Sequence, residues 1–214
     1  MAERAIQLKA ANRGLRREIA DRKEVESALE KERQIVQLLR SGAEAASSAT
    51  GLDPALQFTL NHVCTHVGWP LGCAYRVQDA TNPELSSPRV WYVRDTARLN
   101  EFQELTDATV NASRQGWISR ALQTKQVIWL EDLGQGGNFL RAKVAKASGI
   151  KTGLIAPVFM GQSAVAVLEF FSTETKKPDA RLCDAMQQVG IQLARIFERD
   201  GAQNACAPRN DWQP

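Results

Sequence analysis

The 214-residue sequence lacks the features that mark several classes of protein. It has no strong excess of charge: 27 Lys and Arg residues face 24 Asp and Glu residues, and residues 1–40 carry the whole net charge of +3. A nucleic-acid-binding protein usually has a larger and more clustered basic excess. The longest run without a charged residue or a histidine, residues 152–168, is broken by Pro157 and by a Gly-Gln-Ser turn that begins at Gly161, so it is too interrupted for a membrane span. We expect neither nucleic-acid binding nor membrane insertion.

Cysteine and histidine are also scarce. The sequence has four cysteines: Cys64, Cys73, Cys183 and Cys206. They show no CxxC or other metal-ligand spacing, and the first 20 residues lack the apolar core of a secretion signal, a combination that indicates reduced thiols in a cytoplasmic protein. His62 and His66 stand four residues apart, as in some metal sites, but no Asp or Glu between residues 54 and 78 completes a ligand set. We predict no metal site.

Residues 1–41 lack proline and predict one long helix. One seven-residue repeat in this segment is mostly apolar, and its members are Leu8, Leu15, Arg22, Leu29 and Val36. The positions four residues further on are mostly polar: Asn12, Ile19, Glu26, Arg33 and Arg40. This weak heptad pattern favours a parallel, dimeric signalling coiled coil. The alternative is a solvated helix that packs on its own domain.

The rest of the chain predicts a mixed α+β domain. Expected strands cover residues 71–78, 89–94, 127–130, 152–160 and 163–172, and helices lie between and around them. The strands are too closely spaced for parallel crossovers, so we predict one mainly antiparallel sheet with 163–172 near its centre. Terminal helices would cover one face of the sheet, and a loop-and-helix lid would cover the other. A final helix carries an apolar stripe at residues 182, 186, 189, 193 and 196, and the tail from Gly201 is expected to be flexible.

Six segments, in this order and spacing, resemble a GAF domain. They are residues 68–75 (GWPLGCAY), 116–122 (GWISRAL), 127–132 (VIWLED), 138–142 (NFLRA), 156–158 (APV) and 165–172 (VAVLEFFS). The resemblance covers about residues 33–200 and is to the bacterial GAF domains found upstream of sensor histidine kinases and diguanylate cyclases. The preceding helix is similar to the signalling coiled coils of those sensors. The expected organisation is a coiled-coil helix over residues 1–41, a GAF domain over 42–200 and a flexible tail over 201–214.

The resemblance implies a sensory or regulatory module without catalysis. Relatives that bind a bilin covalently carry an anchoring cysteine near residue 138, but residues 132–150 contain neither Cys nor His, so a covalent bilin is disfavoured. The NKFDE signature of cyclic-nucleotide GAF domains is missing, and the lid, residues 95–150, lacks the cysteines that free methionine sulfoxide reductases use on the same fold. No identifiable cofactor is implied; the resemblance implies sensing of an unidentified small ligand or of a protein partner. The output module is expected on another chain or outside this sequence.

A small ligand of such a domain is expected between the sheet and the lid. Aromatic walls would come from Trp91, Phe102, Trp117, Trp129 and Phe139. The glycine-rich segment 134–138 precedes a predicted helix that Asn138 would cap, and free N–H groups there, together with Arg141, would anchor an anionic group. Alternatively, Arg141 pairs with Glu131 or Asp132, and the aromatic residues are plain core. Glu169 interrupts an apolar strand, and we expect it to face solvent.

The leading functional hypothesis is a homodimeric sensory module whose N- and C-terminal helices meet those of a second copy. One alternative is a dimerisation scaffold with a collapsed pocket. The other is an enzyme of the methionine sulfoxide reductase type, which would need an accessible cysteine of low pKa with a second cysteine nearby.

Overall fold

The computed structural model describes residues 2–48, 51–77, 85, 90–109, 116–133 and 141–206. The chain separates into two compact units, Met1–Gln37 and Leu38–Pro214. The first unit is formed by most of α1, a continuous helix over Ala2–Ser48. The predicted domain boundary at residues 41–42 therefore falls inside a helix. No helix in the described residues combines the length and the apolar character needed to cross a bilayer.

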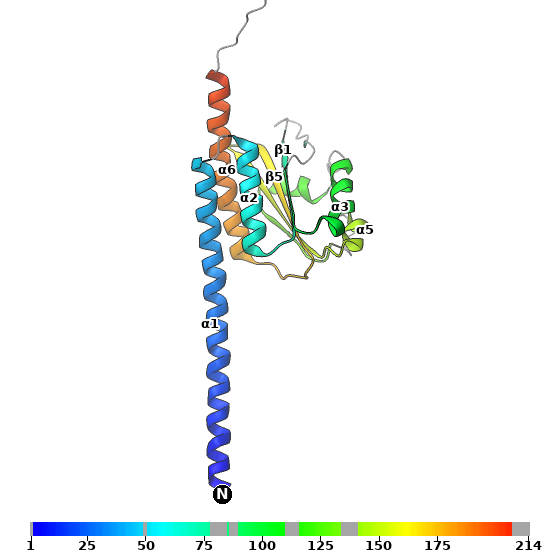
Figure 1. Ribbon diagram of the computed structural model, residues 1–214. Helices are drawn as coiled ribbons and strands as arrows, with labels where there is room; N and C mark the ends of the chain where they lie inside the picture. The colour runs from blue at the N-terminus through cyan, green and yellow to red at the C-terminus, as the bar shows by residue number, and fades with distance from the viewer. Residues whose placement is uncertain are drawn as a thin grey trace, which may run out of the picture. The chain divides into compact units, whose positions relative to one another are not determined.

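A five-stranded antiparallel sheet forms the centre of the second unit (Figure 1). Its strands are β1 (Leu71–Arg76), β2 (Val90–Val93), β3 (Ile128–Leu130), β4 (Thr152–Met160) and β5 (Ser163–Ser172). They lie in the order β2-β1-β5-β4-β3, and every neighbouring pair is antiparallel. The prediction that segment 163–172 forms a central strand between 71–78 and 152–160 is confirmed.

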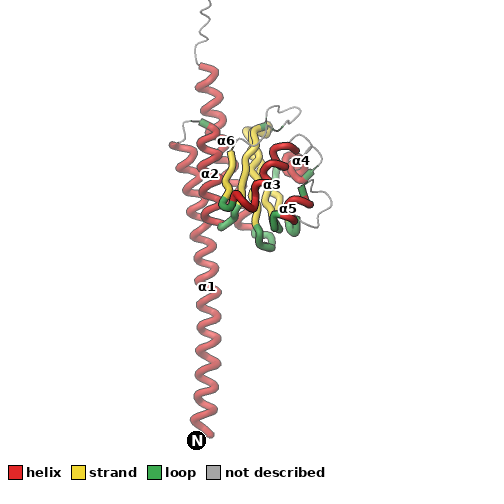
Figure 2. The backbone as a smooth tube through the Cα atoms, turned by 45° about the vertical axis from the view of Figure 1, so that its right-hand side comes forward, coloured by secondary structure: helices red, strands yellow, loops and turns green. Residues whose placement is uncertain are grey.

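Helices cover both faces of this sheet (Figures 1 and 2). Helices α2 (Leu52–Val67) and α6 (Ala180–Cys206) lie on one face. Helices α3 (Thr96–Thr109), α4 (Trp117–Thr124) and α5 (Ala142–Ala147) lie on the other face, and we call them the lid. The predicted α+β class with a helical lid is thus confirmed. Helix α6 includes residues 201–206, which we had expected to be flexible; no proline interrupts the chain before Pro208.

The apolar stripe of α6 is used inside the domain. Its members, Leu182, Met186, Val189, Leu193 and Ile196, are all at most 8% exposed. Helix α6 packs along β4, and this contact covers the surface that we had expected a second copy to cover. Among the large apolar side chains described on α6, only Ile191 is exposed. The stripe therefore gives no support for a dimer contact at the C-terminal helix, which stays a prediction.

Close packing of α2 against β1 gives a first testable prediction. A Cβ atom at Gly72 would lie 2.9 Å from the Cys64 sulfur and 3.2 Å from a ring carbon of Phe170. We expect Gly72→Ala to lower the free energy of unfolding by about 1–3 kcal/mol, because the core has no room for the methyl group. Urea denaturation followed by tryptophan fluorescence measures this loss. Gly14→Ala on α1, where a Cβ atom would meet nothing within 4 Å beyond the adjacent residues and the helix's own backbone, should leave the transition of the domain unchanged.

Candidate functional site

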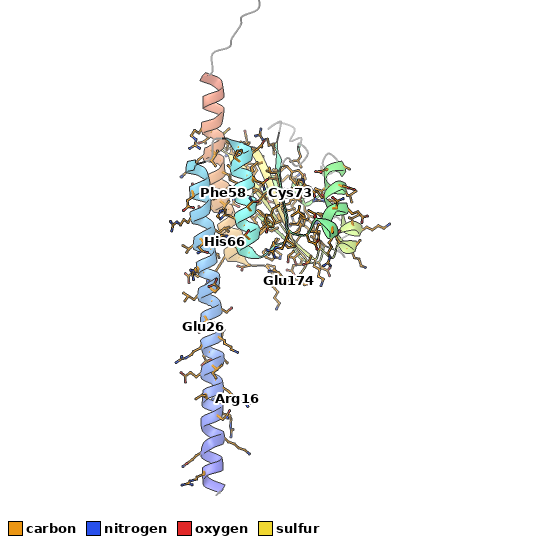
Figure 3. All side chains as sticks on the ribbon, in the orientation of Figure 1. Arg16, Glu26, Phe58, His66, Cys73 and Glu174 are labelled. Atoms are coloured by element: carbon orange, nitrogen blue, oxygen red, sulfur yellow. The ribbon has the colours of Figure 1, made fainter. Side chains whose placement is uncertain are left out.

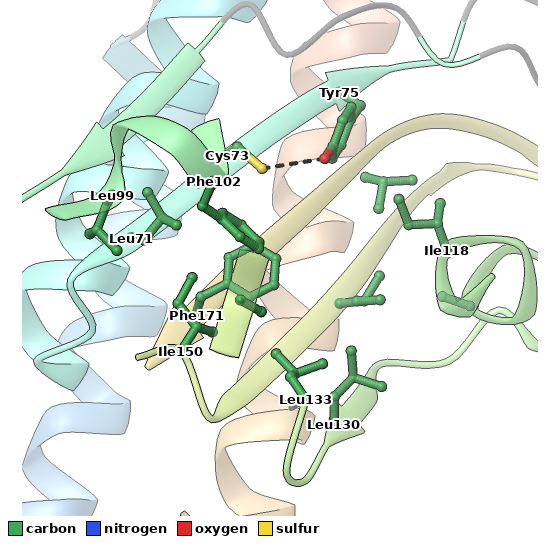
Figure 4. Packing of buried hydrophobic residues seen from close by; sticks show 14 of the residues in the cluster. Leu71, Cys73, Tyr75, Leu99, Phe102, Ile118, Leu130, Leu133, Ile150 and Phe171 are labelled. Atoms are coloured by element: carbon green, nitrogen blue, oxygen red, sulfur yellow. Dashed lines mark hydrogen bonds between the residues drawn. The ribbon is translucent and has the colours of Figure 1, made fainter. Parts of the chain in front are cut away.

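The lid-side face of the sheet is lined by alternate residues of its strands. Leu71, Cys73 and Tyr75 of β1 belong to one buried cluster with Val167 and Phe171 of β5. Side chains on a strand alternate between the two faces, so Glu169 of β5 points to the same face as Val167 and Phe171. Figure 4 shows this layer, in which Cys73 hydrogen-bonds to Tyr75 and Phe102 of the lid belongs to the same buried cluster.

A group of polar side chains lies in this otherwise apolar layer, and we call it the buried polar cluster. Its members are Arg141, Glu169, Tyr75, Thr106 and Cys73. None of them is more than 5% exposed. Thr106 belongs to α3 and Arg141 immediately precedes α5, whereas the other three residues belong to the sheet. The cluster therefore joins the lid to the sheet.

Arg141 and Glu169 form the centre of the cluster. Arg141 Nη2 lies 2.7 Å from Glu169 Oε1 and 2.8 Å from Oε2, and Nη1 donates a hydrogen bond of 2.9 Å to the Thr106 hydroxyl. The Tyr75 hydroxyl donates to Glu169 Oε2 at 2.6 Å and lies 3.4 Å from Arg141 Nη1. Both carboxylate oxygens thus accept hydrogen bonds, as a buried charge requires.

Aromatic rings enclose the guanidinium group. The Arg141 Cζ atom lies 5.3 Å from the ring centroid of Phe102 and 5.5 Å from that of Phe171. The two rings meet edge to face with centroids 5.0 Å apart. Cation–π attraction strengthens when the pair is shielded from water. The Arg141 guanidinium therefore lies beside both the lid residue Phe102 and the sheet residue Phe171, which also contact each other.

Burial sets the protonation states around this pair. Burial raises the pKa of the Tyr75 hydroxyl well above its usual value, and Cys73 and Glu169 raise it further. The pKa of the Cys73 thiol is raised well above its usual value by burial first and by Glu169 second. Burial, the largest single effect, would lower the pKa of Arg141, but Glu169, Tyr75 and Cys73 together outweigh it and raise that pKa. Tyr75 and Cys73 are therefore neutral, and Arg141 is charged.

The structure brings together part of the predicted site. Phe102 and Arg141 meet in the buried polar cluster, and Trp91 and Trp117 pack as half-buried residues against the lid-side core. Trp129 is misplaced by the prediction: its ring meets Trp69 edge to face at 5.6 Å, and its Nε1 donates to the Lys176 carbonyl. Ile128 and Leu130 on either side of it point to the lid, so Trp129 points to the opposite face. Asn138 and Phe139 lie outside the described residues.

Three expectations about charged or capping residues are corrected. Glu169 is 0% exposed rather than facing solvent, because helices cover both faces of β5 and Arg141 compensates its charge. Arg141 pairs with Glu169, not with Glu131 or Asp132. Helix α5 begins at Ala142, with Arg141 in the cap position, so Asn138 is not its N-cap. With only six residues, α5 also offers no extended helix end for an anion.

The described thiols differ from those of a redox enzyme. Burial raises the pKa of Cys64 and Cys73, and burial together with Asp179 and Asp184 raises that of Cys183. A reactive cysteine needs a lowered pKa and access to solvent. No group of three or more potential metal ligands occurs in the described residues either. His66 Nδ1 instead lies 2.8 Å from the His62 carbonyl oxygen, and the two rings stack.

These observations define a sheet-and-lid domain with a buried ion pair between its layers. A family model for the GAF domain matches residues 49–198, and the chain therefore belongs to the GAF domain family. GAF domains are generally sensory or regulatory modules. The comparison with curated proteins found no match.

Several solved structures share the fold. The GAF domain of a phosphoenolpyruvate-protein phosphotransferase from Coxiella burnetii is 15% identical with a TM-score of 0.62, over 80% of this chain and 97% of that chain. Free methionine-R-sulfoxide reductase from Neisseria meningitidis, in complex with its substrate, is 14% identical with a TM-score of 0.61, over 79% of this chain and 91% of that chain. A phycoerythrobilin-bound GAF domain from a cyanobacterial phytochrome is 14% identical with a TM-score of 0.59, over 79% of this chain and 97% of that chain. At these identities the likeness is one of fold alone.

Proposed function

We propose that this chain is the input module of a bacterial signalling protein of the histidine kinase or diguanylate cyclase type. It binds a small anionic ligand between sheet and lid, without catalysing a reaction, and passes the signal on through a dimeric α1 helix to an output module on another chain or beyond this sequence. The observation that carries this proposal is the buried pair Arg141–Glu169, which links lid and sheet with charges instead of apolar side chains.

The three described thiols are unpaired and so suit a reducing cytoplasm.

A buried ion pair is weak support for stability. Well-packed apolar residues of similar volume are often as stabilising or more so. The pair does provide a positive group that a second anion can share or take over. A carboxylate or phosphate that enters the lid layer would compete with Glu169 for the Arg141 guanidinium, which favours bidentate contacts to such groups.

Such an exchange would couple binding to movement of the lid. Arg141 bonds to Glu169 of the sheet and to Thr106 of α3. An anion that draws Arg141 away from Glu169 would break the charged link between α5 and β5. A coupling free energy of about 1–3 kcal/mol is typical for regulation of this kind.

Native mass spectrometry of the freshly purified protein tests the ligand. We expect a retained mass that is lost on denaturation. Glu169→Gln keeps the shape and removes the competing charge, so it should raise the occupancy of an anionic ligand. Arg141→Gln should abolish the retained mass. Arg120→Gln, which changes an exposed residue of the lid helix α4, is the matched control and should retain the wild-type mass.

A scaffold with a collapsed pocket is the second candidate function. It is favoured by the layer between sheet and lid, where fifteen buried side chains, among them Phe102, Ile118 and Leu133, already pack together. If neither the wild type nor Glu169→Gln retains a ligand, the scaffold replaces the sensor. Both the sensor and the scaffold require a dimer. A monomer in light scattering at tens of micromolar would contradict the dimer under either function.

A further inference from the structure

The exposed side of α1 carries an apolar row interrupted by charges. Five large apolar side chains on this helix are 48–67% exposed: Leu15, Ile19, Val25, Leu29 and Val36. Between Ile19 and Leu29, the same row contains Arg22 and Glu26, which are also exposed. Figure 3 shows Glu26 projecting sideways from the helix. The exposed apolar side chains are unusual for a helix that is surrounded by water on all sides. The charges among them are unusual for an ordinary coiled coil with a continuous apolar seam.

The heptad positions indicate which partner fits. With Leu15 and Leu29 at position d, Ile19 falls at position a, a combination that favours two parallel strands. Asn12 also falls at position a, where a polar residue specifies register at a cost in stability. These positions match a second copy of the same helix in parallel orientation.

We propose that α1 pairs in register with α1 of a second copy and that the charges in its seam are partnered across the dimer. This pairing rests on the dimer of the proposed function. The charged contacts determine the register in which the two α1 helices pair. A side chain at position a packs into the facing helix beside the preceding d and g residues. Glu26 of each copy therefore lies beside Arg22 of the other. Arg33, at the next position a, lies beside Glu32 of the other copy.

These pairs specify one register. Within a single helix, Arg22 is held by Glu18, four residues earlier, at 3.0 Å, and both side chains are at least 61% exposed. In the dimer, Arg22 also lies within reach of Glu26 of the second copy. A slip of one heptad would place Arg22 of one copy opposite Leu29 of the other, and the second Arg22 opposite Leu15. The neighbouring seam positions of Leu15, Asn12 and Ile19, offer that second charge no carboxylate. The charges thus weaken the seam and at the same time disfavour the slipped pairing.

The test uses two charge reversals in the full chain. Arg22→Glu places only carboxylates in the central layers of its homodimer, and Glu26→Arg places only guanidinium groups there. We expect each variant alone to raise the dimer dissociation constant roughly tenfold or more, because each dimer loses two ion pairs and gains like-charge contacts. An equimolar mixture of the two should form mainly the heterodimer, which native mass spectrometry resolves by mass. No contact within a single helix can produce such a preference.

Arg17→Glu and Glu24→Arg are the matched controls, because both residues are exposed and lie at the outer position f. Each should dimerise like the wild type, and their mixture should be statistical. A statistical mixture of Arg22→Glu with Glu26→Arg would overturn the charge pairing and leave the dimer standing. A monomeric wild type at tens of micromolar would overturn the dimer itself.

Orientation is tested by Leu15→Cys under mild oxidation. A parallel pair in register brings the two introduced thiols together at position d, so we expect a covalent dimer that the parent chain does not form under the same conditions. Absence of that cross-link in a chain that still dimerises would overturn the parallel register.

Discussion

Replacing Glu169 with Leu is expected to lower the free energy of unfolding by about 3–5 kcal/mol. The change leaves the Arg141 guanidinium buried without its carboxylate, and the Tyr75 hydroxyl loses the acceptor that lies 2.6 Å away. Urea denaturation followed by tryptophan fluorescence measures the loss. The double variant Arg141→Met, Glu169→Leu should recover most of it, because an apolar pair of similar volume removes both charges from the core.

The matched control is the ion pair Arg76–Asp53, whose nitrogen and oxygen lie 2.8 Å apart but whose side chains are 37% and 40% exposed. Asp53→Asn should cost no more than about 1 kcal/mol, because water screens an exposed pair. Equal losses for Glu169→Leu and Asp53→Asn would mean that the Arg141–Glu169 pair is not desolvated in solution. A double variant no more stable than Glu169→Leu alone would mean that the cost lies in shape and not in the uncompensated charge.

The fold was predictable because the strong signals are local. The strands at 152–160 and 163–172 were placed correctly, since two apolar runs meet at the Gly161–Gln162 turn. The apolar stripe of α6 was also recognised, but the sequence could not say whether its own sheet or a second copy covers it. That depends on the contact with β4, which joins parts of the chain far apart in sequence.

The candidate site was predictable only in part, because its contacts are long-range. Glu169 lies 28 residues from Arg141, and no local pattern connects them. Alternation along β5 could have placed Glu169 on the same face as Val167 and Phe171, and its burial then follows once the lid covers that face. Trp129 was misplaced because β3 has only three residues, too few for the alternation to fix which face each residue occupies.

Phe102→Ala is expected to lower the free energy of unfolding by about 3–5 kcal/mol, as for other buried phenylalanines. Phe102 is 0% exposed, and the change removes both its edge contact with Phe171 and the ring next to Arg141. Phe102→Leu keeps much of the apolar volume but loses the ring face, so about 1.5 kcal/mol or less is expected from packing. If Phe102→Leu lowers the free energy of unfolding by more than this packing loss, the excess measures the contribution of the cation–π contact between Phe102 and Arg141. Urea denaturation of both variants gives these values.

A double-mutant cycle separates that contribution from ordinary core packing. Phe102→Ala and Glu169→Leu both act on Arg141, so their combined effect should depart from the sum of the single effects by at least about 0.5 kcal/mol. Phe58→Ala on α2 is the control: its half-buried ring lies tilted against His62 with centroids 4.1 Å apart, and its effect should add to that of Glu169→Leu. Additivity of Phe102→Ala with Glu169→Leu would show that the lid helix α3 and strand β5 are stabilised independently. In that case exchange of an anion at Arg141 could not carry a signal from the lid to the sheet.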